Sequence, residues 1–190
     1  MKQNAEPYIE TYSGEKFYFL NPTEDSIHIK DIAHALANKC RFAGHCSDFY
    51  SVAEHSYIVS ILVEPHLALE GLLHDASEAY LEDIPRPIKP YFKEYKGFED
   101  KIMGVISKKF GISFPESPEV KVADSVQLIS EARHLMPSRG EVDYPQIPEG
   151  RIGKKPKCLP PFQAKKLFLG RFYELTNTGP IEASSIIARL

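Results

Sequence analysis

Hydrophobic residues recur at helical spacing along most of this 190-residue chain. From Ile29 onward, apolar side chains return every three or four positions, the period of a helix with one buried face. Ser51 suits an N-cap, and Glu54 three residues later would complete a capping box. We predict about six helices, at 29–39, 51–63, 67–75, 91–110, 118–136 and 162–175, and a short helix at 181–190.

The pattern differs near the N-terminus, where aromatic and β-branched residues alternate with polar ones between Tyr8 and Leu20. Ser13-Gly14 supplies turn chemistry between the two runs, which is typical of a β-hairpin. A lone hairpin is only marginally stable, so we expect it to contact the helices. The predicted fold class is all-α, a helical bundle with a small N-terminal β-hairpin extension at residues 1–22.

Prolines and glycines interrupt the helical pattern in two places. Three prolines between Ile84 and Pro90 exclude a regular helix there. Five prolines and three glycines between Ser138 and Pro161 predict a surface loop at 138–161. Neither interruption is long enough to separate two folding units, so we predict one domain spanning residues 1–190.

Composition narrows the range of partners. The net charge is −3, which gives no electrostatic basis for binding nucleic-acid polymers or anionic membranes. The longest apolar stretch, Tyr57 to Val63, is too short for a membrane span, and the N-terminus does not resemble a signal peptide. Three cysteines without regular spacing fit a reducing compartment, and we expect a cytoplasmic protein. A zinc knuckle around Cys40 and Cys46 has poor spacing.

Four ionisable residues lie in otherwise apolar helical stretches: His55, the adjacent pair His74-Asp75, and Asp124. Burying such groups is costly unless they are paired or bind a metal. Each has a plain structural alternative, such as a core histidine, a helix end or a pair with Lys121. One shared divalent metal accounts for all four, because two imidazoles and two carboxylates form a mixed nitrogen and oxygen ligand set.

Geometry constrains this hypothesis. Three helices of a bundle can direct side chains to one internal site. Adjacent residues on a helix, however, point about 100° apart. His74 and Asp75 can therefore share one metal only if it lies between their directions, or if they lie near a helix end where the backbone can adapt.

The ordered set of Arg41-Phe42, Ser51-Val-Ala-Glu-His-Ser56, His74-Asp-Ala-Ser-Glu78, Asp83 and Asp124 resembles the HD-domain metal phosphohydrolases. Within them it is similar to the small 5′-nucleotidases acting on deoxynucleoside monophosphates. The blocks at 31–37, 40–45 and 49–55 look closer to a phage and bacillus branch. That branch includes deoxyadenosine triphosphate triphosphohydrolases and the phosphohydrolase of oxetanocin A biosynthesis. The resemblance covers about residues 12–133.

The resemblance implies roles for particular residues. The metal ligands would be His55, His74, Asp75 and Asp124. Glu78 would orient or deprotonate the attacking water, and Asp83 would act near the sugar or leaving oxygen as a general acid. Arg41 would contact the phosphate, with His45 and Lys89 as further phosphate-binding candidates.

The function implied is metal-dependent removal of phosphate from a nucleotide or nucleoside-analogue 5′-phosphate. Cobalt, manganese and magnesium are the favoured metals, with iron, nickel and zinc as alternatives. The resemblance also suggests a homodimer. Alternatives are a triphosphohydrolase that releases triphosphate, a non-catalytic nucleotide-binding regulator and a di-iron oxygenase. The di-iron reading is disfavoured because no histidine lies between His74 and Asp124.

Overall fold

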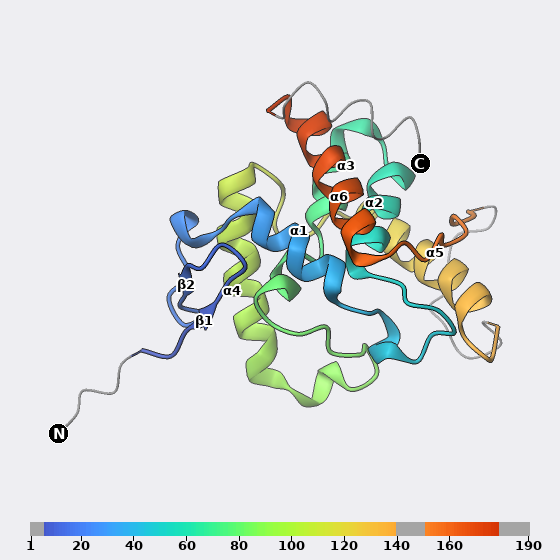
Figure 1. Cartoon of the computed structure of the whole chain (residues 1–190), viewed down its shortest axis with the longest axis horizontal. Coiled ribbons are helices and arrows are strands. Elements are labelled where there is room, and N and C mark those ends of the chain that lie inside the picture. Colours follow the sequence, from blue (N-terminus) through green and yellow to red (C-terminus); the bar gives the residue numbers. More distant parts are fainter. Residues whose placement is uncertain (1–5, 140–150, 179–190) are drawn as a thin grey trace.

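The computed structural model describes residues 6–139 and 151–178. These residues form a mostly helical protein with one two-stranded antiparallel sheet, as the hydrophobic pattern predicts (Figure 1). The predicted helix at 181–190 lies outside the described residues, as do residues 1–5 of the hairpin extension and 140–150 of the predicted loop. The α-helices are α1 (Ile29–Asn38), α2 (Val52–Leu62), α3 (Ala68–Leu73), α4 (Lys93–Phe110), α5 (Pro118–Leu135) and α6 (Pro161–Thr176).

Short elements connect these helices. The hairpin consists of β1 (Ile9–Glu10) and β2 (Lys16–Phe17), and its strands are shorter than the sequence pattern suggested. Five 3-10 helices occur within the described residues: η1 (Glu24–Ser26), η2 (Phe42–Gly44), η3 (Pro65–Leu67), η4 (Ala76–Ala79) and η5 (Lys89–Tyr91). The proline-rich segment at 84–90 is non-helical until η5 begins at Lys89, as its prolines required.

The hairpin contacts the helical body, as its small size required (Figure 1). Its turn is fixed to α1, because the backbone N–H and hydroxyl of Ser13 both donate to the Asp31 carboxylate at 2.8 Å. Phe17 from β2 is fully buried and stacks on Tyr80, with ring centroids 4.1 Å apart. The hairpin therefore covers part of the core instead of extending into solvent.

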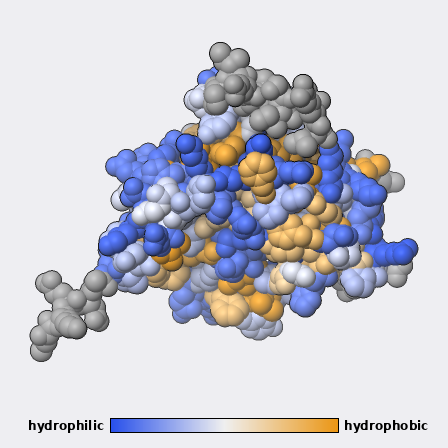
Figure 2. Space-filling view, in the orientation of Figure 1, coloured by the Kyte–Doolittle hydropathy of each residue, from blue (hydrophilic) through white to orange (hydrophobic). Residues whose placement is uncertain are grey.

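One large hydrophobic cluster joins β2, α1, α2, α3, α4 and α6. In Figure 1, α1 and α6 cross near the centre, the hairpin lies beside α1 and α4, and α5 lies toward the opposite side. On the face shown in Figure 2, hydrophilic residues cover much of the surface and hydrophobic ones appear in patches between them. No helix within 6–139 or 151–178 combines the length and apolar character that crossing a membrane requires.

Only one of the two hydrogen bonds of the predicted capping box forms at the N-terminus of α2. Ser51 caps the helix by accepting the backbone N–H of Glu54 at 3.1 Å. The reciprocal half of the capping box is absent, because the buried Glu54 carboxylate instead accepts the backbone N–H groups of Lys157 and Leu159, at 2.7 and 2.8 Å. Glu54 therefore connects α2 to a segment more than 100 residues away.

The described part of the predicted 138–161 loop is non-helical up to Pro160 and largely exposed, but hydrogen bonds attach it to the helices. The Lys154 carbonyl accepts hydrogen bonds from Gln127 and Ser130 of α5. Gly153 lies so close to α5 that a Cβ there would fall 2.6 Å from the Ser130 Cβ. Residues 151–160 thus pack along α5 and α2, with Leu159 buried, and they hold these two helices beside each other.

Candidate metal centre

Three ionisable side chains from three helices converge in the interior. His55 lies in the first half of α2, His74 directly follows α3, and Asp124 lies in the first half of α5. Helix α2 contacts both α3 and α5, which brings the three residues together. One ligand atom from each lies within 4.8 Å of the other two. This His55–His74–Asp124 group could hold a metal ion.

The distances within the group suit a shared cation. Two ligands about 2.1 Å from a metal lie about 3.0 Å apart at a right angle and about 3.4 Å apart at the tetrahedral angle. The Nε2 atoms of His55 and His74 are 3.3 Å apart. The Nε2 of His55 lies 3.2 Å from Oδ1 of Asp124. Both separations fall in the range that two ligands of one metal require.

The tautomers of the two rings support the same conclusion. The Nδ1 of His74 lies 2.9 Å from the Gly71 carbonyl oxygen, which can only accept a hydrogen bond. The Nδ1 of His55 lies 2.6 Å from a carboxylate oxygen of Glu131. Each Nδ1 therefore carries a proton, so the lone pairs of the facing Nε2 atoms repel unless a proton or a cation lies between them. This arrangement is typical of histidines that ligate a metal through Nε2.

Asp75 lies beside this group, just past the end of α3, where the backbone is free to leave the helical conformation. Helix α3 ends at Leu73, and the backbone at Asp75 has left the helical conformation (φ −98°, ψ 14°). Its Oδ2 lies 3.1 Å from the Nε2 of His74 and 3.8 Å from the Nε2 of His55. The angular conflict between adjacent helical residues is thus relieved, and Asp75 faces both imidazoles.

Glu131 also belongs to this region, although the sequence alone gave it no role. It is fully buried and accepts hydrogen bonds from Tyr50 at 2.8 Å, Arg41 at 2.9 Å and His55 at 2.6 Å. Burial raises the pKa of Glu131, but the Arg41 and His55 charges outweigh it, and the pKa is lowered overall. Its position seven residues after Asp124, on the same face of α5, was the available signal.

Arg41 is buried and connects this carboxylate to the cluster. Its Nε donates to Glu131, and its Nη1 lies 3.7 Å from Oδ2 of Asp75. The Arg41 side chain is about 10% exposed, so these are interior contacts and not a surface salt bridge. Arg86, from the proline-rich segment, also contacts the cluster, with Nη2 2.8 Å from Oδ2 of Asp124. Asp124 thus contacts Arg86, not Lys121, and sequence reasoning did not identify Arg86.

Glu78 and Asp83 lie near the cluster without belonging to it. Glu78 lies in η4 and is 5% exposed, and its Oε2 is buried without a hydrogen-bond partner among the described residues. Burial raises the pKa of Glu78 well above its ordinary value, and the nearby Asp75 and Asp83 carboxylates add to this effect. Burial and Asp75 also raise the pKa of the half-buried Asp83, against the opposing charge of Arg41.

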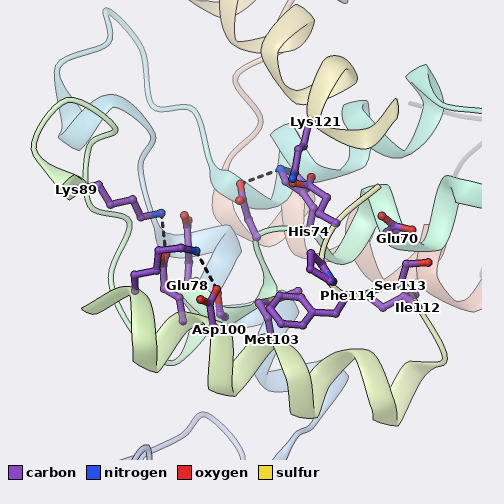
Figure 3. A pocket seen from close by; sticks show the side chains of 16 residues that line it. Glu70, His74, Glu78, Lys89, Asp100, Met103, Ile112, Ser113, Phe114 and Lys121 are labelled. Atoms are coloured by element: carbon purple, nitrogen blue, oxygen red, sulfur yellow. Dashed lines mark hydrogen bonds and ion pairs between the residues drawn. The ribbon is translucent and has the colours of Figure 1, made fainter. Parts of the chain in front are cut away.

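A cavity of about 400 Å³ opens beside His74 and Asp75 (Figure 3). Its lining carries six carboxylates and three lysines, and apolar side chains from α4 and the segment before α5 complete it. Lys89 and Glu78 lie on one side of His74, and Phe114 and Ser113 lie on the other (Figure 3). The cavity size is within the usual range for small-molecule sites.

Two predicted phosphate-binding candidates are placed less favourably. His45 is exposed at the end of η2, and no hydrogen bond or ion pair joins its ring to another residue of 6–139 or 151–178. Lys89 lines the cavity, but its ammonium forms an ion pair with Glu99 at 2.7 Å. Contact between Lys89 and a phosphate would therefore compete with this pair.

Metal affinity should depend on pH with a definite sign. In the metal-free protein, burial lowers the pKa of His74, but the Asp75 and Asp124 carboxylates outweigh it and raise the pKa to about 10. His74 therefore holds a proton that a metal must displace. We expect Mn²⁺ or Co²⁺ to bind more tightly as the pH rises from about 6 to about 9, with proton release. Calorimetry in buffers of different ionisation enthalpy measures both quantities, and a pH-independent affinity would contradict the assignment.

The fold and the cluster define a helical protein with a candidate site for a divalent metal. No protein-family model matches the chain. It is 42% identical over 172 residues to the uncharacterized protein YfdR of Escherichia coli K12, which covers 90% of this chain and 96% of YfdR. It is also 32% identical over 190 residues to an uncharacterized protein of Rhodobacter capsulatus, covering 87% of this chain and 94% of that protein. The chain therefore belongs to the same protein family as YfdR.

Proposed function

We propose that this protein is an HD-domain phosphohydrolase that removes phosphate from a nucleotide with the help of a divalent metal. The observation that carries the proposal is the pair of Nε2 atoms of His55 and His74, 3.3 Å apart and both facing carboxylates. A metal bound there would lower the pKa of a water ligand and withdraw charge from a phosphoryl oxygen. The ordered motif set of the sequence supports the same family.

The surrounding residues supply the remaining chemistry. Glu78 has an unpaired, buried carboxylate oxygen and a raised pKa, which suit a group that takes a proton from the attacking water. As the water oxygen bonds to phosphorus, the ester P–O bond breaks and the leaving oxygen needs a proton. Asp83, whose pKa is also raised, is the candidate donor. Arg41 and Arg86 place two guanidinium groups beside the cluster, where they would neutralise phosphate oxygens.

The charge of the cavity favours a short phosphate chain. Six carboxylates outnumber three lysines along its lining, and two of these lysines are paired with lining acids: Lys89 with Glu99, and Lys96 with Asp100. A triphosphate tail extended into this cavity would meet like charge. We therefore place a nucleoside 5′-monophosphate first among substrates, and a triphosphohydrolase activity second.

The test is a screen of nucleoside mono-, di- and triphosphates against Mn²⁺, Co²⁺, Mg²⁺, Fe²⁺, Ni²⁺ and Zn²⁺, with products identified by phosphorus NMR. We expect metal-dependent release of orthophosphate from monophosphates. Release of triphosphate as the first product would instead identify the protein as a triphosphohydrolase. Nucleotide binding without turnover under every metal would show that the protein is not a hydrolase, and would favour a regulator.

A further inference from the structure

Two of the three cysteines lie in contact with each other, outside the metal cluster. The Sγ atoms of Cys40 and Cys46 are 3.5 Å apart, close enough for a weak hydrogen bond between the two thiols. Cys158 is also a free thiol, and no hydrogen bond joins its sulfur to either member of the pair within residues 6–139 and 151–178. Cys40 and Cys46 therefore form a dithiol, and Cys158 provides an internal comparison.

The loop that carries the two thiols is anchored at both ends. Cys40, at its start, forms an isolated antiparallel bridge with Ser51. Directly after Cys46, the backbone N–H of Ser47 donates to the Leu135 carbonyl at 2.9 Å. Both ends of the loop are thus attached to the helical body, and these attachments keep the two sulfur atoms face to face.

The backbone between the thiols has an unusual conformation. Phe42 and Ala43 have φ values of 54° and 50°, in the left-handed region that bulky residues seldom adopt, and Gly44 follows with φ 79°. Such strain persists only where the surrounding structure enforces it, and it is concentrated at functional sites. Residues 43–45 are exposed, and no atom lies within 4 Å of the position that a Gly44 Cβ would take. A small reagent can therefore reach the loop, and the tip of the loop has room to move.

We propose that Cys40 and Cys46 form a reversible disulfide by exchange with a low-molecular-weight disulfide of the glutathione type. The sulfur atoms of a disulfide are about 2.05 Å apart, so the two thiols need to approach each other by only about 1.5 Å. Arg41 lies within the ring that this bond would close, so the modification site adjoins the candidate metal centre. The exchange requires neither a metal nor a nucleotide, and it is independent of the proposed hydrolysis.

The exchange takes place in two steps. The Cys40 thiolate attacks one sulfur of the small disulfide, whose S–S bond breaks and releases the first small thiolate. The Cys46 thiolate then attacks the Cys40 sulfur of the mixed disulfide and displaces the second. The two protons lost by the protein pass to the released thiolates, so the protein is oxidised by two electrons and the small disulfide is reduced. Burial raises the pKa of the Cys46 thiol to about 11, and its hydrogen bond with Cys40 adds to this effect, which disfavours Cys46 as the first nucleophile.

The test is to treat the reduced, full-length, folded protein with glutathione disulfide and then to alkylate the remaining thiols. A chelator in the buffer excludes oxidation catalysed by free metal ions. We expect peptide mass spectrometry to find one Cys40–Cys46 disulfide per chain, with Cys158 alkylated, and dithiothreitol to reverse the change. A disulfide that includes Cys158, a mixed disulfide that persists on the pair, or alkylation of all three thiols would overturn the proposal.

Variants with one cysteine replaced assign the two steps. Cys46→Ser should stop the reaction at a mixed disulfide, with one glutathione attached to Cys40, because no neighbouring thiol can displace it. Cys158→Ser is the matched control and should form the Cys40–Cys46 disulfide as readily as the wild type. If the wild type and Cys46→Ser gave the same product, Cys46 would have no part in the reaction and the proposal would fail.

The unfolded chain provides a second control, since cysteines six residues apart also meet when the backbone is disordered. The ratio of oxidised to reduced protein at fixed glutathione ratios gives the effective concentration of one thiol at the other. Because the folded loop holds the thiols in contact, we expect this effective concentration to be roughly tenfold or more above its value in guanidinium chloride. An equal or lower value in the folded protein would contradict the proposal, because the fold would then not prepare the pair for reaction.

Discussion

Replacing His74 by alanine should abolish metal binding and nucleotide hydrolysis together. The Nε2 of His74 lies within 3.3 Å of both the His55 Nε2 and the Asp75 Oδ2, so its loss removes the ligand that connects the two. A lost outer-shell partner already costs up to about 100-fold in metal affinity, and a direct ligand should cost more. Metal content after dialysis and orthophosphate release measure the two effects.

His66→Ala is the matched control for this change. His66 lies eight residues earlier in η3, is exposed, and is outside the cluster. This variant should retain both metal and turnover. If His74→Ala kept wild-type metal content, or lost metal while hydrolysis continued, the candidate centre would not be the catalytic site.

Replacing Glu78 by glutamine should have the second largest effect and should separate catalysis from metal binding. The Glu78 carboxylate is buried against Asp75 and Asp83 and has a free oxygen, whereas an amide of the same shape cannot take up a proton. We expect turnover to fall about 100- to 10,000-fold while metal content is unchanged. Stopped assays with saturating Mn²⁺ give the rate, and elemental analysis gives the metal content.

Stability provides an independent readout for Glu78. Burial and like-charged neighbours disfavour its ionised form, so the amide should raise the free energy of unfolding by about 1 kcal/mol. Urea denaturation of the metal-free proteins measures this change. Glu82→Gln is the control, since Glu82 is largely exposed and should leave turnover unchanged. A purely structural role for Glu78 predicts the opposite result, with lower stability and little change in rate.

Apolar spacing and capping patterns predicted the helices well, because each of these signals depends only on a few neighbouring residues. The spacing of apolar residues placed α1, α4 and α5 within a few positions of their observed limits, and Gly111 ends α4 in the left-handed conformation. The N-cap at Ser51 was likewise predictable. Its partner Glu54 was not, because the N–H groups it accepts come from residues 157 and 159, which no local rule connects to α2.

In the candidate metal centre too, the contacts between distant segments could not be predicted from local patterns. Mixed imidazole and carboxylate chemistry in apolar stretches was sufficient to select His55, His74 and Asp124, and the structure brings these three together. Sequence spacing places Glu131 on the Asp124 face of α5, but it cannot show that Arg41 and Tyr50 meet there. The contact of Arg86 with Asp124 depends on the course of a proline-rich segment, for which no periodicity exists.

The hydrogen bonds of Glu131 limit how the centre can coordinate an ion. One of its oxygens accepts from both Tyr50 and His55, and the other accepts from Arg41. A carboxylate with both oxygens engaged cannot rotate inward to become an extra ligand without breaking a buried network. An ion that prefers six ligands would then take further oxygens from solvent or, if the proposed function holds, from the phosphate of the substrate. The rigidity of one outer carboxylate would thus leave room for the reactant.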